Sequence, residues 1–178
     1  MSIRDIKQAL VATIESIPNI GRVHNRMRRL PRTPTQQDVQ NVFGIEDQTS
    51  ERGWSIRTWM WYRQGRLARR ETLDNQVWSF THHMVLQGYV EINDAYDSET
   101  EWNALCDAIT QALQPREEAP LLAWAQHWSL PELRIEADAT IVGLYECHDA
   151  ELRMDVEELI NNSDPDQSVY LHTGVWNL

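Results

Sequence analysis

Apolar residues recur near the start of the chain at steps of three or four, the spacing of one helix face. This face consists of Ile3, Ile6, Leu10, Ile14 and Ile17. Pro18 ends the pattern because the residue before a proline avoids the helical region. Asn19 and Gly21 suit the turn that follows. We therefore predict an N-terminal helix, a turn and a short strand over Arg22–Met27.

Strict alternation of apolar and polar residues predicts three longer strands, over Gly53–Gln64, Val77–Ile92 and Glu146–Glu158. In the first, one face begins polar and becomes aromatic at Trp59 and Trp61, so we expect another element or another subunit to cover its far end. In the third, apolar residues alternate with carboxylates, the pattern of a half-buried strand. These carboxylates belong to Asp149, Glu151, Asp155 and Glu157.

Helical spacing returns in two places between the strands. A short helix follows Thr35 and stops at Gly44, and a long one opens near Asp97 and ends near Leu113. Ser98 and Glu101 match a capping box at the start of the long helix. Ile45–Gly53 and Gly65–Asn75 read as loops, whereas Leu133–Ala137 and Thr140–Leu144 read as short strands.

This order of elements predicts an α+β fold, a mainly antiparallel sheet with two long helices packed on one face. Residues 1–160 form a single domain in this prediction. Residues 161–178 form a C-terminal tail that contains Trp176 and buries little alone, so it packs back or docks on a neighbouring subunit.

Charge is divided unevenly along the 178 residues, whose net charge is −11. Residues 1–70 carry 13 Arg or Lys against 6 Asp or Glu, and residues 71–178 carry 3 against 21. The division indicates either complementary surfaces or two charge sets that solvate opposite faces. Because the total is acidic, a general nucleic-acid binder is disfavoured.

The basic residues fall in two groups. The first group is Arg22, Arg26, Arg28, Arg29 and Arg32, and the second is Arg66, Arg69 and Arg70. Three roles are open for them: contact with carboxylates of a partner protein, contact with DNA phosphates in a lumen, or a solvated basic loop. Trp59, Trp61 and Trp176 join them as candidate interface residues, since Trp is enriched at interfaces, although core packing is the alternative.

No motif for catalysis or for a cofactor is present, so we expect neither an enzyme nor a bound cofactor. His82 and His83 point to opposite faces of a strand and cannot chelate one ion together. A mixed metal site of His82, His148 and Cys106 stays open. Cys106 and Cys147 lie in apolar patterns and read as buried thiols. The first 17 residues mix charges with apolar residues, and no run suits a membrane span, so we expect a cytosolic protein.

Five short motifs, in this order, resemble the tail-terminator (tail-completion) proteins of long-tailed bacteriophages. They are Ile17-Pro18-Asn19-Ile20-Gly21-Arg22-Val23-His24, Gly53-Trp54-Ser55-Ile56-Arg57-Thr58-Trp59, Thr81-His82-His83-Met84-Val85-Leu86-Gln87-Gly88-Tyr89, Asp97-Ser98-Glu99 with Leu105, Asp107, Ala108 and Ile109, and Cys147-His148-Asp149-Ala150-Glu151-Leu152. The match is one of order and spacing over roughly residues 1–158. The acidic character of residues 146–158 and the segment after Asn161 are not assigned to any feature of that family.

The resemblance implies a virion protein, made in the host cytoplasm, that assembles as a homo-hexameric ring at the top of the tail tube. Such a ring would contact the tail-tube protein and the head–neck connector or adaptor, and DNA would pass through its lumen. Two alternatives are another neck or tail component, such as a head–tail adaptor or a tube or baseplate subunit, and a small bacterial enzyme or binding module.

Overall fold

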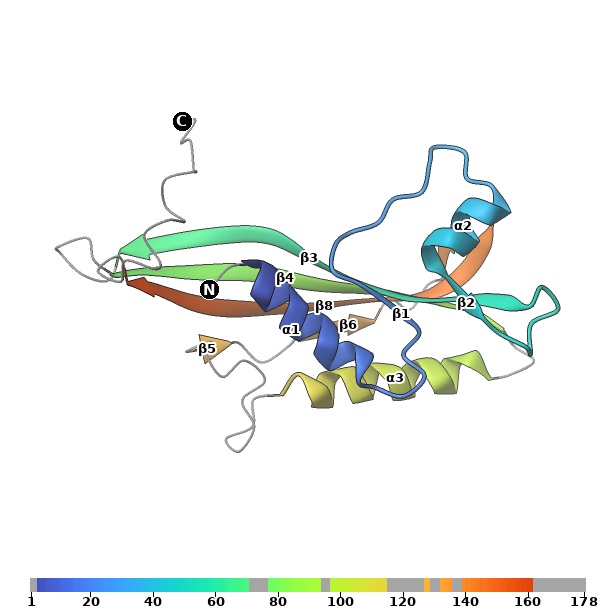
Figure 1. Cartoon of the computed structure of the whole chain (residues 1–178). Helices are drawn as coiled ribbons and strands as arrows, with labels where there is room; N and C mark the ends of the chain where they lie inside the picture. The colour runs from blue at the N-terminus through green and yellow to red at the C-terminus, as the bar shows by residue number, and fades with distance from the viewer. Residues whose placement is uncertain are drawn as a thin grey trace.

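Three long antiparallel strands form the scaffold of the molecule (Figure 1). The computed structural model describes residues 3–70, 77–93, 97–114, 127–128, 132–135 and 139–161. Strand β4 (Val77–Glu91) lies between β3 (Trp54–Arg70) and β8 (Tyr145–Asn161) and pairs with both along its length. β4 therefore has a hydrogen-bonded neighbour on each side, whereas β3 and β8 face outward on one side each.

Short strands extend the two outer sides of this scaffold. β1 (Arg22–His24) pairs parallel with β3, and β2 (Gly44–Glu46) pairs antiparallel with it. The outer side of β8 pairs antiparallel with three pieces, β5 (His127–Trp128), β6 (Glu132–Ile135) and β7 (Thr140–Val142). The described residues thus form an α+β fold with a mixed, mostly antiparallel sheet and three helices, in agreement with the predicted class.

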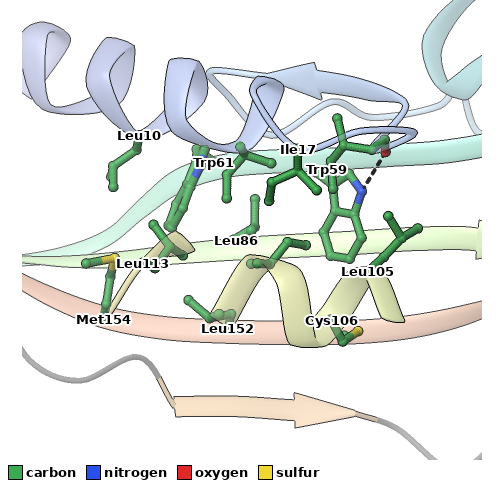
Figure 2. Packing of buried hydrophobic residues seen from close by; sticks show 14 of the residues in the cluster. Leu10, Ile17, Trp59, Trp61, Leu86, Leu105, Cys106, Leu113, Leu152 and Met154 are labelled. Atoms are coloured by element: carbon green, nitrogen blue, oxygen red, sulfur yellow. Dashed lines mark hydrogen bonds between the residues drawn. The ribbon is translucent and has the colours of Figure 1, made fainter. Parts of the chain in front are cut away.

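Helices α1 (Ile3–Glu15) and α3 (Ser98–Ala112) lie on the same face of the sheet and close the larger core (Figures 1 and 2). Burying each Leu or Ile of this core stabilises the fold by roughly 1.5–3 kcal/mol. Its central side chains are Ile6, Leu10 and Ile14 of α1, Trp59 and Trp61 of β3, Met84 and Leu86 of β4, Leu105 and Ile109 of α3, and Leu152 and Met154 of β8. Helix α2 (Gln36–Phe43) covers part of the opposite face, where Val39 and Phe43 pack with Trp54, Ile56, Met60, Val142 and Cys147.

The turn after α1 is fixed to the core through Trp59. Asn19 and Gly21 both adopt left-handed backbone conformations, with φ of 58° and 89°. The turn places the carbonyl oxygen of Ile20 2.9 Å from Trp59 Nε1, which donates a hydrogen bond to it (Figure 2). The Trp59 ring stacks on Trp102, with 5.4 Å between ring centroids, and it lies over Gly88, where a Cβ would be 2.1 Å from the ring. Gly88 therefore marks a close approach of the strand backbone to a side chain.

Several predicted boundaries were wrong: the first strand ends at His24 and not at Met27, and β8 runs to Asn161 and not to Glu158. At β3 the reason is that pairing between strands overrides local sequence. β3 does not end at Gln64 but continues to Arg70, through an irregularity between Arg63 and Gly65, because β4 supplies partners along the whole length. The charged segment that read as a loop from Gly65 is strand in its first six residues. Near the start of β3, the segment after Gly44 that was predicted as a loop begins as strand β2, which pairs with β3.

The helix caps also differ from the prediction. Asp97, not Ser98, caps α3: its carboxylate accepts from the backbone N–H of Thr100. The hydroxyl of Ser98 instead accepts from the backbone N–H of Asn93, at 2.9 Å. A capping box does occur at α2: the side chains of Thr35 and Asp38 each accept a hydrogen bond from the backbone N–H of the other residue.

Candidate interaction surfaces

The first arginine group lies on a segment that is tied to α2 and β3. The Arg22 guanidinium donates to the carbonyl oxygen of Asn41 at 2.6 Å, and His24 Nε2 lies 2.9 Å from that of Val42. The backbone N–H of Arg28 points at Met60 Sδ, 3.3 Å away. Arg22 is half-buried, and the exposed members of the group are Arg26, Arg28, Arg29 and Arg32. The fold therefore holds the backbone of this segment in place while four guanidinium groups face outward.

An apolar hollow of about 230 Å³ lies beside Arg28, between the basic segment and β7. We call it the Met27 hollow; its wall includes Met27, Arg28, Leu30, Met60, Tyr89 and Ile141. Met27 is 42% exposed and Ile141 63% exposed, and Leu144 in the next turn is 75% exposed. Apolar side chains at the centre with arginines beside them are the composition of a protein–protein contact. The sequence prediction missed this hollow, because its walls come from segments more than 100 residues apart in the sequence.

The second arginine group lies on the outer half of β3. Arg66 and Arg69 are both exposed, and the Arg66 guanidinium sits 3.9 Å from the ring centroid of Phe80 on β4. Arg63, a residue that the sequence prediction did not select, is exposed on the same half of the strand. Arg70 is the last residue of β3. The group is thus part of the sheet and does not project as a loop.

The four carboxylates of β8 lie on the sheet face opposite α1 and α3, as the alternation predicted. Each is partly exposed, and each has a polar neighbour on an adjacent strand or on β8 itself. Thr140 and Gln87 donate to Asp149, Arg153 pairs with Glu151, His83 Nδ1 lies 2.7 Å from Asp155, and Ser79 donates to Glu157. This arrangement fixes an acidic strip along the outer long strand of the sheet.

A second acidic region lines a groove of about 930 Å³ at the end of the sheet near β2 and the start of α3. Its carboxylates are Glu46, Asp47, Glu91, Asp97 and Glu101. Two of them are paired, Glu101 with Arg57 at 2.6 Å and Glu91 with Arg52 at 2.5 Å. Hydrogen bonds from Thr49 hold the pKa of the Asp47 carboxyl below its usual value. Carboxylates outnumber arginines, so the groove is negative at neutral pH.

Trp59 and Trp61 were predicted as interface residues, and this was wrong. They are 1% and 0% exposed, because α1 and α3 cover the aromatic end of that strand face within the same chain (Figure 2). The elements that cover this face of β3 therefore belong to the same chain and not to another subunit. Trp176 lies outside the described residues.

Two of the buried titratable side chains, those of His82 and Glu158, form a close pair. His82 is 2% exposed and its Nε2 lies 3.0 Å from the carboxylate of Glu158, which is also buried. His148 stacks on Trp102 at a centroid distance of 5.7 Å, and burial lowers its pKa. Cys106 and Cys147 are buried, in agreement with the prediction, and burial raises the pKa of each thiol to about 12. Within the described ranges, no three His, Cys, Asp or Glu side chains are grouped so as to hold a metal ion.

Comparison with known proteins adds no family assignment: no family model matches the chain, and no curated protein matches it in sequence. In the part of the chain that the structure describes, no helix has the length and apolar character needed to cross a membrane.

Proposed function

We propose that this chain is a structural virion protein, a tail terminator that forms a ring, caps the tail tube and joins it to the head–neck connector. One observation carries the proposal: a single subunit bears two surfaces of opposite character. The Met27 hollow with Arg28 is one, and the acidic groove, which shares no lining residue with the hollow, is the other; the acidic strip borders the hollow, because Gln87 and Thr140 line it and donate to Asp149. A head-to-tail ring needs two different complementary patches, because each subunit presents one patch to each neighbour.

The arrangement of the quoted motifs supports the same proposal. The Pro-Asn-Ile-Gly turn leads from α1 into β1, and the tryptophan motif lies on β3 beside it. The histidine motif lies on β4, the Asp97 motif opens α3, and the last motif lies on β8. All five therefore lie in or beside the central sheet and the two helices on one of its faces, so they belong to one folded unit.

The Met27 hollow favours a protein partner over DNA for the first arginine group. Phosphate contacts in a lumen require positive charge but no apolar surface. Here Arg28 borders exposed Met27 and Ile141, and burying these side chains against a partner is favourable. We therefore assign Arg26, Arg28 and Arg29 to a contact with carboxylates of an adjacent subunit or of an adjoining ring.

The test measures the mass of the purified full-length protein by size-exclusion chromatography with light scattering, and tail joining by electron microscopy. We expect a hexamer for the wild type and loss of the ring for the R28E/R29E variant. The R4E/K7E variant is the matched control, because it changes the net charge equally on α1, and it should keep the ring. A wild-type protein that stays monomeric and joins no tails would refute the function. Unchanged assembly of R28E/R29E would refute the role of these arginines.

A further inference from the structure

The Met27 hollow has a buried apolar floor and an exposed apolar rim. Phe43, Met60 and Val142 form the floor and are 4%, 3% and 6% exposed. Met27 and Ile141 form the rim and are 42% and 63% exposed. Sites for small molecules usually enclose about 300–1,000 Å³. A hollow of about 230 Å³ is therefore the right size for one large aliphatic side chain and too small for a whole ligand.

Both walls of the hollow are attached to the same part of the core. On the side of the basic segment, the backbone N–H of Arg28 points at Met60 Sδ, 3.3 Å away. On the side of β7, Gly143 lies so close to α2 that a Cβ there would be 2.6 Å from Val39 Cγ2. The fold therefore forms the hollow before any partner arrives, which lowers the entropic cost of binding.

The two walls differ in charge. Arg28 lines the hollow from the basic segment, and the other exposed arginines of the first group are its neighbours in the sequence. On the other wall, Gln87 and Thr140 line the hollow, and both donate to the carboxylate of Asp149. Carboxylates of a partner are therefore attracted on the first side and repelled on the second.

Two polar groups of the hollow can orient a partner's backbone. Burial raises the pKa of Tyr89 to about 12, so its hydroxyl stays protonated at neutral pH and can donate to a carbonyl or carboxylate oxygen. Gln87 uses its amide N–H on Asp149, which leaves its amide oxygen to accept from a backbone N–H. A few polar groups beside an apolar floor are typical of sites that fix the orientation of what they bind.

We propose that the Met27 hollow binds one leucine, isoleucine or methionine side chain of an extended partner segment whose carboxylates lie on one side of that anchor. The aliphatic side chain fills the hollow, and the carboxylates face the first arginine group. Duplex DNA would bring phosphates but no aliphatic side chain, so it would leave the floor and the rim uncovered. The assignment rests on the ring-forming function proposed above, in which an adjacent subunit or the connector supplies the segment.

Fluorescence anisotropy with labelled peptides and the full-length protein tests this assignment. One probe is a short peptide in which a run of glutamates precedes a single leucine and uncharged residues, and a second probe has the reverse order. We expect one of the two orders to bind, with an affinity that falls as salt is added. Replacing its leucine by alanine should weaken binding about tenfold, because the methyl groups that fill the hollow are lost.

Variants of the protein show where the probe binds. I141A should weaken binding about fivefold, whereas L144A should leave it unchanged, because Leu144 is an exposed aliphatic residue of the same hairpin that lies outside the wall of the hollow. R28E should weaken binding about tenfold and reduce its salt dependence. R4E changes the net charge equally on α1 and should weaken binding less than about twofold. Circular dichroism confirms that each variant is folded before binding is measured.

Three outcomes would overturn the inference. The first is that neither probe binds although light scattering shows a hexamer; in that case the proposed function stands and the assignment of the hollow fails. The second is equal binding of the leucine and alanine probes, or of the wild type and I141A, because the contact would then depend on charge alone. The third is displacement of the probe by duplex DNA from the wild type and I141A alike, which would assign the arginines to phosphates. Leucine-dependent binding by a protein that stays monomeric and joins no tails would support the hollow as a binding site and refute the ring.

Discussion

Substitution of Gly88 by alanine tests the packing on which the larger core depends. Gly88 lies on β4 opposite Trp59 and Ala150, so its missing side chain makes room for an indole ring. A Cβ at this position would lie 2.1 Å from Cζ3, 2.3 Å from Cε3 and 2.7 Å from Cη2 of Trp59. An ordinary contact begins at 3.4 Å, so the ring must move by at least about 1.3 Å.

The ring cannot move without losing its other contacts. Its Nε1–H donates to Ile20 at 2.9 Å, and its face stacks on Trp102. A buried donor left unsatisfied costs about 1–3 kcal/mol, and the lost stack costs about 0.5–1.5 kcal/mol. Overpacking adds a cost of about 1–3 kcal/mol. Alanine offsets about 0.5–1 kcal/mol of the total, because it restricts the unfolded chain more than glycine does. We therefore expect G88A to destabilise the protein by about 3 kcal/mol or more.

Urea unfolding followed by circular dichroism gives the difference in the free energy of unfolding. G65A is the matched control: it is also a glycine in a long strand, but its Cβ would meet only the side chain of His83, at 3.1 Å. Since that side chain is nearly half exposed and can move aside, we expect a cost below about 1 kcal/mol. In a W59F background, where the smaller ring leaves room, G88A should cost about 1 kcal/mol.

Two results would refute this reasoning. One is a G88A variant within about 1 kcal/mol of the wild type, which would mean that the ring relocates at little cost. The other is an equal cost of G88A in the wild-type and W59F backgrounds, because additivity would show that Gly88 and Trp59 are not coupled.

Two further predictions concern titratable groups. Burial raises the pKa of the Cys106 and Cys147 thiols from 9.0 to about 12, so the fraction present as thiolate falls about a thousandfold. A thiol reagent at about pH 8 should therefore label the native protein far more slowly than the urea-unfolded protein. Rapid labelling of the native protein would contradict the burial of these thiols. In the folded protein, burial lowers the pKa of the His24 imidazole below 6.5. As the pH falls, the unfolded chain therefore binds a proton at His24 before the folded protein does, and the free energy of unfolding decreases from about pH 6.5 downward. The H24Q variant should lose less stability than the wild type between about pH 7.5 and pH 5.5 in urea titrations, and an equal loss would exclude His24 as a contributor.

The local sequence was sufficient to predict the elements that depend on only a few neighbouring residues. The helical spacing up to Ile17 and the turn through Asn19 and Gly21 needed no tertiary information. The end of β3 was missed for the opposite reason: Gly65–Arg70 is charged and contains a glycine, and only its pairing with β4 makes it a strand. The parallel pairing of β1 with β3 likewise depends on where the chain returns.

The candidate surfaces likewise differ in whether the local sequence was enough to predict them. Alternation alone placed the β8 carboxylates on one face, because the period of a strand decides this. The Met27 hollow joins a loop to β7, more than 100 residues later, so no local pattern could reveal it. Trp59 and Trp61 were assigned to an interface because the sequence shows that a strand face is covered, but not whether the cover comes from the same chain.

The central position of β4 also has a consequence for synthesis of the chain. β4 is complete at Glu91, but its partner β8 ends at Asn161, 70 residues later. At roughly 5–20 residues per second, a ribosome needs about 4–14 s to deliver that partner. During this interval the apolar residues Met84, Val85 and Leu86 of the nascent chain have no β8 to pair with. A general chaperone that binds these residues would protect them until β8 displaces it, so the yield of folded protein depends on the completion of β8.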